Sequence, residues 1–268
     1  MINQPEPVFS FTIPYYTSSN GETDELFVSE KTYGKYLLAV NKTNVIVIHG
    51  TQHPISFTYG EVTTTLFDNK KSIIVIGTKD LDEYTSELID IAIAQELEKI
   101  VLMDRNEFFR FLYDESTPDP IKIFIDDFQQ TVEEIHITKR LKKEGYRIHE
   151  REASLAEDIL ANAIHFTELR NISPFENEHG VFLLTKLIYL HYSDRSLYQQ
   201  YKVRLQPNYQ RLFIEAEKLL SVIKKVNLST ARGRERAIDK VFQYLNYKKY
   251  VKKITLNDVE EFHVQLRV

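Results

Sequence analysis

The spacing of apolar residues changes along this chain of 268 residues, and that change limits its fold more than any single motif does. In the first third, short runs rich in β-branched and aromatic residues are separated by turn sequences, a pattern that predicts hairpin-connected strands. These strands are expected at residues 36–40, 44–50, 55–67 and 72–77. The sequence therefore predicts a sheet early in the chain.

From Ser72 onward, apolar runs of strand length alternate with segments of helical length. The pattern predicts helices at 80–98, 105–115 and 131–144, with strands at 99–103 and 121–126 between them and Gly145 ending the last helix. Alternation of this kind is typical of a layered sheet with parallel neighbours. We therefore predict an α/β domain with a mixed sheet over residues 1–150.

Beyond residue 150 the strand signals fade and apolar residues recur at helical spacing. Helices are expected at 154–170, where Ser154 and Glu157 form a capping-box pattern, at 180–192, at 209–226 and at 234–247, with a short last helix capped by Thr255 and Asp258. The clearest apolar stripes are Leu212, Ala216, Leu219, Leu220 and Ile223 in one helix, and Ile238, Val241, Phe242 and Leu245 in another. Residues 151–268 are therefore predicted to form an all-α domain.

Composition narrows the functional classes. The chain has no cysteine, which excludes disulfides, thiolate metal sites and cysteine nucleophiles. It has no basic leader running into an apolar segment and no run near about 18 apolar residues, so we expect a cytoplasmic protein without membrane contact. The net charge of −5 hides an asymmetry, because residues 199–253 hold 14 basic and four acidic residues.

Asp126 and Asp127 end an apparent strand, the position at which many ATPases hold a magnesium ion. Such enzymes also need closely spaced glycines, so that backbone N–H groups can approach the phosphates. The eight glycines of this chain are all at least ten residues apart. Walker-type and Rossmann-type nucleotide sites are therefore excluded, and the two aspartates are interpreted as a solvated strand end. No cofactor is predicted.

The sequence VIVIHGTQHP gives little support for a hydrolase active site or for a metal site. An α/β-hydrolase needs a G-x-S-x-G nucleophile turn, which the chain lacks. His49 and His53 have a spacing that suits a metal only on a helix, but they flank a turn ending at Pro54 and have no acidic third ligand nearby. Both are interpreted as loop histidines, and no metal site is predicted.

A nuclease remains an alternative. Residues 73–113 resemble the closing strand-helix-strand-helix part of Mrr-type restriction endonucleases, in the Thr after the strand, the Ala-containing helix and the ending LMDRNEFFRFL. The resemblance implies a metal-dependent nuclease in which Asp68 holds a metal and Lys70 orients water. Lys70 lies three residues before Ile73, whereas a helix separates the corresponding strands in those enzymes. Asp68-Asn69-Lys70 is therefore interpreted as a hairpin turn.

The basic C-terminal region is the strongest candidate site, because its cations alternate with tyrosines, a composition that contacts phosphates and stacks on bases. Three arginines also stand at the start of a predicted helix, where the helix dipole disfavours positive charge. The predicted phosphate contacts are Arg232, Arg236, Arg234, Lys248, Lys249, Lys252 and Lys253, with Tyr247 and Tyr250 as stacking partners.

These features predict a binding component rather than an enzyme. Its expected partner is nucleic acid, or alternatively an acidic protein that docks on the basic surface, and self-association into a homo-oligomer is compatible with both. Whether the α/β domain has a site of its own is left open at this point.

Overall fold

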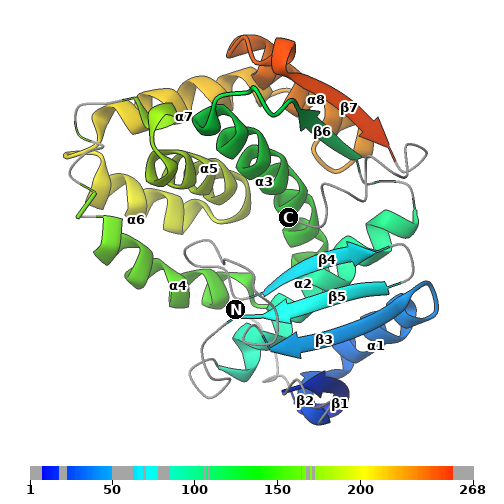
Figure 1. The fold of residues 1–268 in the computed structure, drawn as a ribbon. Helices are drawn as coiled ribbons and strands as arrows, with labels where there is room; N and C mark the ends of the chain where they lie inside the picture. Colours follow the sequence, from blue (N-terminus) through cyan, green and yellow to red (C-terminus); the bar gives the residue numbers. More distant parts are fainter. Residues whose placement is uncertain are drawn as a thin grey trace. The chain divides into compact units, whose positions relative to one another are not determined.

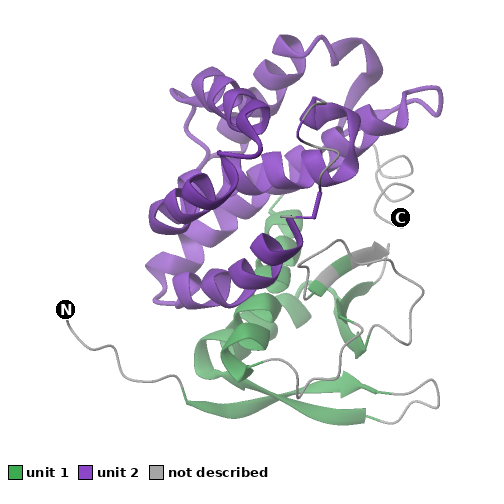
Figure 2. Cartoon of the chain, turned by 90° about the vertical axis from the view of Figure 1, so that its left-hand side faces the viewer, with its two compact units in different colours: residues 1–108, 258–268 green, residues 109–257 purple. Residues whose placement is uncertain are grey.

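The computed structural model describes residues 8–17, 23–49, 63–68, 71–77, 85–105, 107, 109–163, 165–166, 170 and 173–255. They form two compact units, one within residues 1–108 and the other within residues 109–257 (Figure 2). The sequence placed the division near residue 150 instead. Residues 109–150 belong to the second unit, so its boundary lies nearer the N-terminus.

The first unit contains a mixed sheet, as the sequence predicted, and it has five strands, of which the first two were not predicted (Figure 1). Its strands are β1 (Phe9–Tyr16), β2 (Thr23–Ser29), β3 (Asn44–His49), β4 (Thr63–Asp68) and β5 (Lys71–Ile76), in the order β2-β1-β3-β5-β4. The β1/β2 and β4/β5 pairs are antiparallel. The β1/β3 and β3/β5 pairs are parallel, and Asn44 to His49 run in register with Lys71 to Ile76.

Two helices of this unit replace expected strands. Residues 36–40 lie in α1 (Glu30–Val40), and residues 99–103 lie in α2 (Ser86–Asp104). Side-chain caps fix both starts, because Ser29 accepts a hydrogen bond from Thr32 N and Thr85 accepts one from Leu88 N. The apolar run at 99–103 therefore continues a helix that is already formed, instead of starting a strand.

Most of α2 is buried, including three of its carboxylates, and each of these has a partner. Asp90 accepts hydrogen bonds from Ser29 N at 2.7 Å and Ser29 Oγ at 2.8 Å. Glu98 pairs with Lys35 of α1. Glu96 accepts from Thr65 Oγ1 at 2.6 Å and from Lys99 Nζ at 3.0 Å. These contacts connect α2 to α1 and to the edge strand β4.

The second unit is largely helical (Figure 1). It begins with β6 (Phe109–Tyr113), continues through α3 (Asp119–Lys143), α4 (Ile148–Ala163), the short 3₁₀ helix η4 (Pro174–Glu176), α5 (Glu178–Ser193), α6 (Arg195–Leu205), α7 (Gln210–Ile223) and α8 (Ala231–Tyr244), and ends with the 3₁₀ helix η5 (Lys248–Tyr250) and β7 (Val251–Thr255). The helices at 180–192, 209–226 and 234–247 were predicted, and their apolar stripes are buried or partly buried. The short helix expected after the cap at Thr255 and Asp258 lies outside the described residues.

Two predicted elements within residues 105–126 are wrong. The expected helix at 105–115 contains strand β6, and the expected strand at 121–126 lies in the first turns of α3. The alternating apolar residues there also fit helical spacing, since Phe124, Ile125, Phe128 and Val132 are all buried along α3. Pro120 stands in the first turn of α3, where a proline is tolerated.

Strand β6 pairs antiparallel with β7, more than 130 residues later in the chain. Its other edge is covered by a side chain, because Gln129 of α3 accepts a hydrogen bond from Phe111 N at 2.6 Å and donates one to Phe111 O at 3.2 Å. Phe109 and Phe111 are buried in the core of this unit. The long separation of β6 and β7 explains why no local pattern predicted the pair.

Helix α4 begins at Ile148 rather than at Ser154, so the predicted capping box lies inside the helix. Gly145 follows α3 with a φ of 85°, as expected for the glycine that ends a helix. No helix within the described residues is long and apolar enough to cross a membrane.

Candidate nucleic-acid interface

Helix α8 carries the predicted arginines, and its first turn is fixed by close packing. Thr230 caps the helix by accepting a hydrogen bond from Gly233 N at 3.1 Å. A Cβ atom at Gly233 would lie 1.7 Å from the carbonyl oxygen of Asn227. Only glycine fits at this contact, so the turn before α8 sets where the helix begins and which residues face solvent.

Arg234 is not available to a phosphate, which corrects the prediction for this residue. Its side chain is completely buried, and Arg234 Nε lies 3.0 Å from Glu133 Oε2 of α3. Arg234 is one turn before the buried Ile238 and lies on the apolar side of the helix. The arginine thus connects α8 to α3 inside the unit.

Three other cations of α8 are exposed and follow one another every four residues. They are Arg232, Arg236 and Lys240, and the exposed Tyr244 continues the same line. At a rise of about 1.5 Å per residue, neighbouring members of the line are about 6 Å apart along the helix. Within the described residues no carboxylate forms an ion pair with these three cations. Their charges are therefore open to an external anion.

The predicted lysines after α8 are exposed, and two of them are paired with α8. Lys248 Nζ lies 2.8 Å from Asp239 Oδ2, and Lys253 Nζ lies 2.8 Å from Glu235 Oε1. Exposed pairs of this kind contribute little to stability, so a phosphate can replace the carboxylate as partner. Lys249 and Lys252 are also exposed, and Lys249 Nζ is 4.9 Å from the centre of the Tyr250 ring.

The two predicted stacking residues, Tyr247 and Tyr250, are more buried than Tyr244. Tyr247 packs against the core, with its ring centre 5.9 Å from that of Phe124, and burial raises its pKa. Tyr250 meets Tyr247 edge-on at 6.4 Å and is half-buried. Tyr244, which is 49% exposed, offers the most open ring of the three. Sequence reasoning missed Tyr244 and Lys240, although their four-residue spacing from Arg236 places them on its side of the helix.

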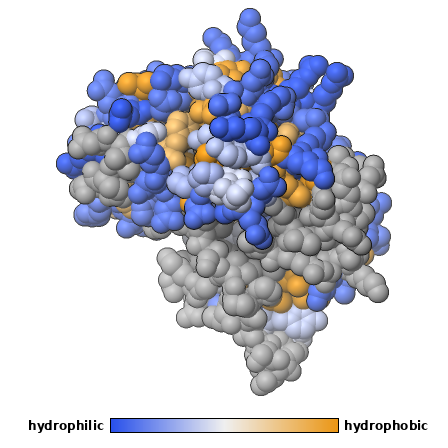
Figure 3. Space-filling view, turned by 45° about the horizontal axis from the view of Figure 1, so that its top comes forward, coloured by the Kyte–Doolittle hydropathy of each residue, from blue (hydrophilic) through white to orange (hydrophobic). Residues whose placement is uncertain are grey.

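We call the set formed by Arg232, Arg236, Lys240, Tyr244, Lys248, Lys249, Lys252 and Lys253 the basic face. It comes from α8, η5 and β7, which lie together in the second unit. Figure 3 turns the upper part of Figure 1 toward the viewer, and hydrophilic side chains predominate there while apolar ones form small separate patches. The face therefore suits a charged ligand better than an apolar one.

Asp126 and Asp127 lie on helix α3 and not at the end of a strand, which corrects their interpretation as a solvated strand end. Asp126 Oδ2 accepts a hydrogen bond from the Tyr113 hydroxyl at 2.6 Å. Burial, and then this hydrogen bond, raise the pKa of Tyr113. In the described part of the chain no three histidine or carboxylate side chains are grouped to hold a metal.

The alternative nuclease site is only partly described. Asp68 ends β4 opposite Lys71, which begins β5, so these antiparallel strands are separated by two residues, as expected for a hairpin. Asn69, Lys70 and His53 lie outside the described residues, and the ring of His49 meets Tyr15 edge-on at 6.4 Å. The second strand expected in the Mrr-like segment, at 99–103, lies in α2, and the helix expected after it contains β6, which pairs with β7 and not with the five-stranded sheet.

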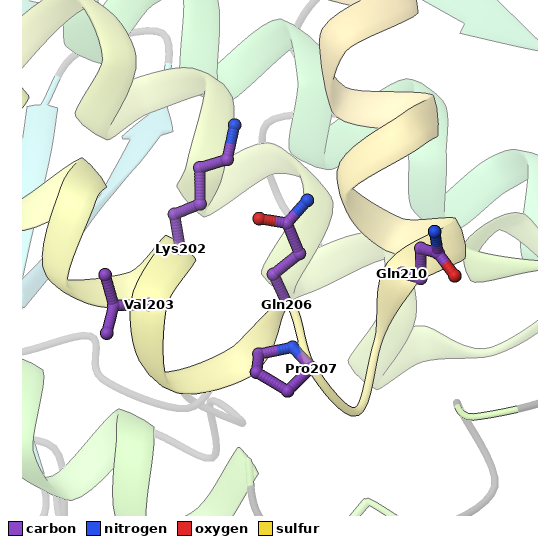
Figure 4. Close-up of a pocket in the computed structure, with 5 residues that line it drawn as sticks. All are labelled: Lys202, Val203, Gln206, Pro207 and Gln210. Atoms are coloured by element: carbon purple, nitrogen blue, oxygen red, sulfur yellow. The ribbon is translucent and has the colours of Figure 1, made fainter.

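An open hollow lies where α6 ends and α7 begins (Figure 4). It is lined by Lys202, Val203, Gln206, Pro207 and Gln210. Lys202, the charged residue among them, forms an ion pair, since its Nζ lies 2.9 Å from Glu217 Oε1. The hollow thus offers a ligand two amides and little charge, and we assign no site to it.

Comparison with protein-family models, with curated proteins and with solved structures gave no match to this chain. Any functional conclusion must therefore come from the site itself.

Proposed function

We propose that the protein binds nucleic acid through the basic face and acts as a binding component rather than as an enzyme. The observation that carries the proposal is the line of exposed cations Arg232, Arg236 and Lys240 on α8, which form no ion pair within the described residues. When an exposed cation without a carboxylate partner binds a phosphate, no ion pair within the protein has to be broken. Phosphate contacts of this kind supply sequence-independent affinity.

Charge on the basic face favours a polyanion. Residues 231–255 hold eight basic and two acidic residues, and only Arg234 among the eight is buried. Glu235 and Asp239 hold Lys253 and Lys248 in place beside α8, which keeps these cations near the helix. Lys248 and Lys253 therefore lie beside α8 before a ligand arrives, which lowers the side-chain freedom that these two lysines lose on binding.

Tyr244 favours single-stranded over double-stranded ligands. Its ring continues the line of cations and is about half exposed. Base stacking on an aromatic ring contributes about 1–3 kcal/mol per base and requires an unpaired base. Tyr250, whose ring centre lies 4.9 Å from Lys249 Nζ, provides a second, partly buried ring.

Fluorescence anisotropy with single-stranded and double-stranded oligonucleotides tests the proposal. We expect log Kd to rise with log salt at a slope of about 3 for single strands if about four phosphates are contacted. The double variant Arg232→Glu/Arg236→Glu should weaken binding at least about 10-fold, since two contacts become repulsive. Tyr244→Ala should weaken single-strand binding by about 5-fold or more, whereas Tyr244→Phe should not.

A matched control changes the same charge elsewhere in the second unit. Lys143 and Lys225 are exposed and, within the described residues, form no ion pair. The variant Lys143→Glu/Lys225→Glu should therefore bind nearly as well as the unchanged protein. No binding of either probe at about 50 mM salt would overturn the proposal and favour an acidic protein as the partner. Equal loss in both double variants would assign the effect to net charge and not to the basic face.

A further inference from the structure

Helix α8 carries two carboxylates, Glu235 and Asp239, among the cations of the basic face. Glu235 follows Arg232 by three residues. Asp239 follows Arg236 by the same spacing. Side chains three residues apart are neighbours on a helix, about 5–6 Å apart at Cβ, and opposite charges at this spacing attract each other. By local spacing alone, each carboxylate would pair with an arginine of its own helix.

The structure pairs both carboxylates with lysines that follow α8 instead. Glu235 Oε1 lies 2.8 Å from Lys253 Nζ of β7. Asp239 Oδ2 lies 2.8 Å from Lys248 Nζ of η5. Among the residues that the structure describes, no carboxylate forms an ion pair with either arginine. The acids are thus occupied from the side of η5 and β7, and the arginines are left to an external anion.

A carboxylate without its lysine would weaken phosphate binding in two ways. It would form an ion pair with the arginine three residues before it, and a phosphate would have to break that pair. It would also repel the phosphate, by about 3-fold in affinity at a separation of about 6 Å in water. A phosphate that displaced Glu235 from Lys253 would free the same carboxylate, so that exchange would gain little affinity.

We propose that Lys248 and Lys253 are positioning residues of the basic face. Each holds a carboxylate of α8 away from an arginine, and neither is itself a phosphate contact. This inference rests on the proposed function, because its ligand is the nucleic acid that binds Arg232, Arg236 and Lys240. The strand then follows the line of these three cations along α8, while the two ion pairs beside the line stay closed.

Anisotropy of a fluorescent oligothymidylate with the full chain separates the two possible roles of Lys253. Its Nζ lies 5.7 Å from the centre of the Phe109 ring, so methionine, which is also unbranched, is the replacement. Lys253→Met should weaken binding by about 3- to 5-fold, because Glu235 is then free to pair with Arg232. Lys253→Met/Glu235→Gln should regain the affinity and the salt slope of the unchanged protein. A direct phosphate contact of Lys253 would instead lower that slope by about 0.7 in the double variant.

The matched control removes a carboxylate from another helix. Lys253→Met/Glu150→Gln has the same net charge as the rescued variant but leaves Glu235 without its lysine, so its binding should stay weak. Glu150 is exposed on α4. Lys248→Met and Lys248→Met/Asp239→Asn repeat the test at the second ion pair, and circular dichroism checks that every variant keeps its fold.

The outcomes distinguish this inference from the proposed function. Binding that is unchanged in Lys253→Met, equal recovery with Glu150→Gln and Glu235→Gln, or a lowered salt slope in the rescued variant overturns the positioning role alone. An unchanged protein that does not bind the oligothymidylate at about 50 mM salt overturns both.

Discussion

At the scale of single residues, one charged group inside the second unit, Arg234, was predicted to lie on its surface. Arg234 was expected to meet phosphate, yet it is buried against Glu133. Breaking such a pair leaves an uncompensated buried charge, which costs about 3–5 kcal/mol. Loss of nucleic-acid binding in an Arg234 variant would therefore report damage to the fold. Arg232 and Arg236 are the residues on which binding should be tested.

Gly233 gives a prediction at the same scale. Gly233→Ala should lower the free energy of unfolding by several kcal/mol, on the order of 3, because its Cβ would overlap the Asn227 carbonyl oxygen unless the first turn of α8 moves. Gly34→Ala, in the open part of α1, is the control and should change stability by less than about 1 kcal/mol. Urea denaturation of dilute protein measures both, and equal effects would contradict the close contact.

At the scale of elements, a buried polar cluster joins three helices of the second unit. Glu152 of α4 receives hydrogen bonds from Lys186 Nζ at 2.6 Å and from the Tyr189 hydroxyl at 3.0 Å, both on α5. The Tyr189 hydroxyl also lies 3.1 Å from Thr138 Oγ1 of α3. Burial alone would raise the pKa of Glu152, but Lys186, Arg151 and these hydrogen bonds hold it below its ordinary value.

The lowered pKa of Glu152 predicts a loss of stability in acid. Below about pH 4.5 the unfolded chain binds a proton at this carboxyl while the folded protein does not, so the free energy of unfolding falls as the pH drops toward the folded pKa. Glu152→Gln should cost on the order of 2 kcal/mol at pH 7 and progressively less below pH 4.5. Urea midpoints from pH 7 to 3 measure the difference. The control is Glu150→Gln, which is exposed on the same helix and should change neither the stability at pH 7 nor its dependence on pH. A Glu152→Gln penalty that stays constant from pH 7 to 3 would contradict the link between the Glu152 pKa and stability.

At the scale of the whole molecule, charge divides between the two units. Residues 109–257 hold 25 basic and 20 acidic residues, a net charge of +5, against −5 for the full chain. The same residues enclose their own hydrophobic core, which includes β6, α3 and the helices that follow. A basic helical unit with its own core is therefore linked to residues whose net charge is −10.

This division predicts that a fragment of residues 109–257 folds alone and binds nucleic acid at least as tightly as the full chain. Its core is complete, and the acidic residues that repel a polyanion have been removed. Circular dichroism and a single cooperative unfolding transition test folding, and anisotropy at fixed salt tests binding. A fragment that folds but no longer binds would show that the first unit contributes to the interface.

The sequence alone determined the elements whose signals are short in range. The apolar stripes of α7 and α8, the end of α3 at Gly145 and the strand at 71–76 follow from periodicity and capping within a few residues. The exposure of Arg232 and Arg236, two of the predicted contacts, is compatible with their four-residue spacing on α8. These features need no knowledge of the rest of the chain.

Only the tertiary structure decided the features that depend on distant partners. The apolar alternation at 121–126 fits a strand and a helix equally well, and packing of Phe124 and Phe128 in the core selects the helix. Strand β6 forms because β7 and the Gln129 side chain satisfy its two edges. The burial of Arg234 depends on Glu133, a hundred residues earlier. Local propensity is similar for the competing states in these segments, so long-range hydrogen bonds and burial determine which state forms.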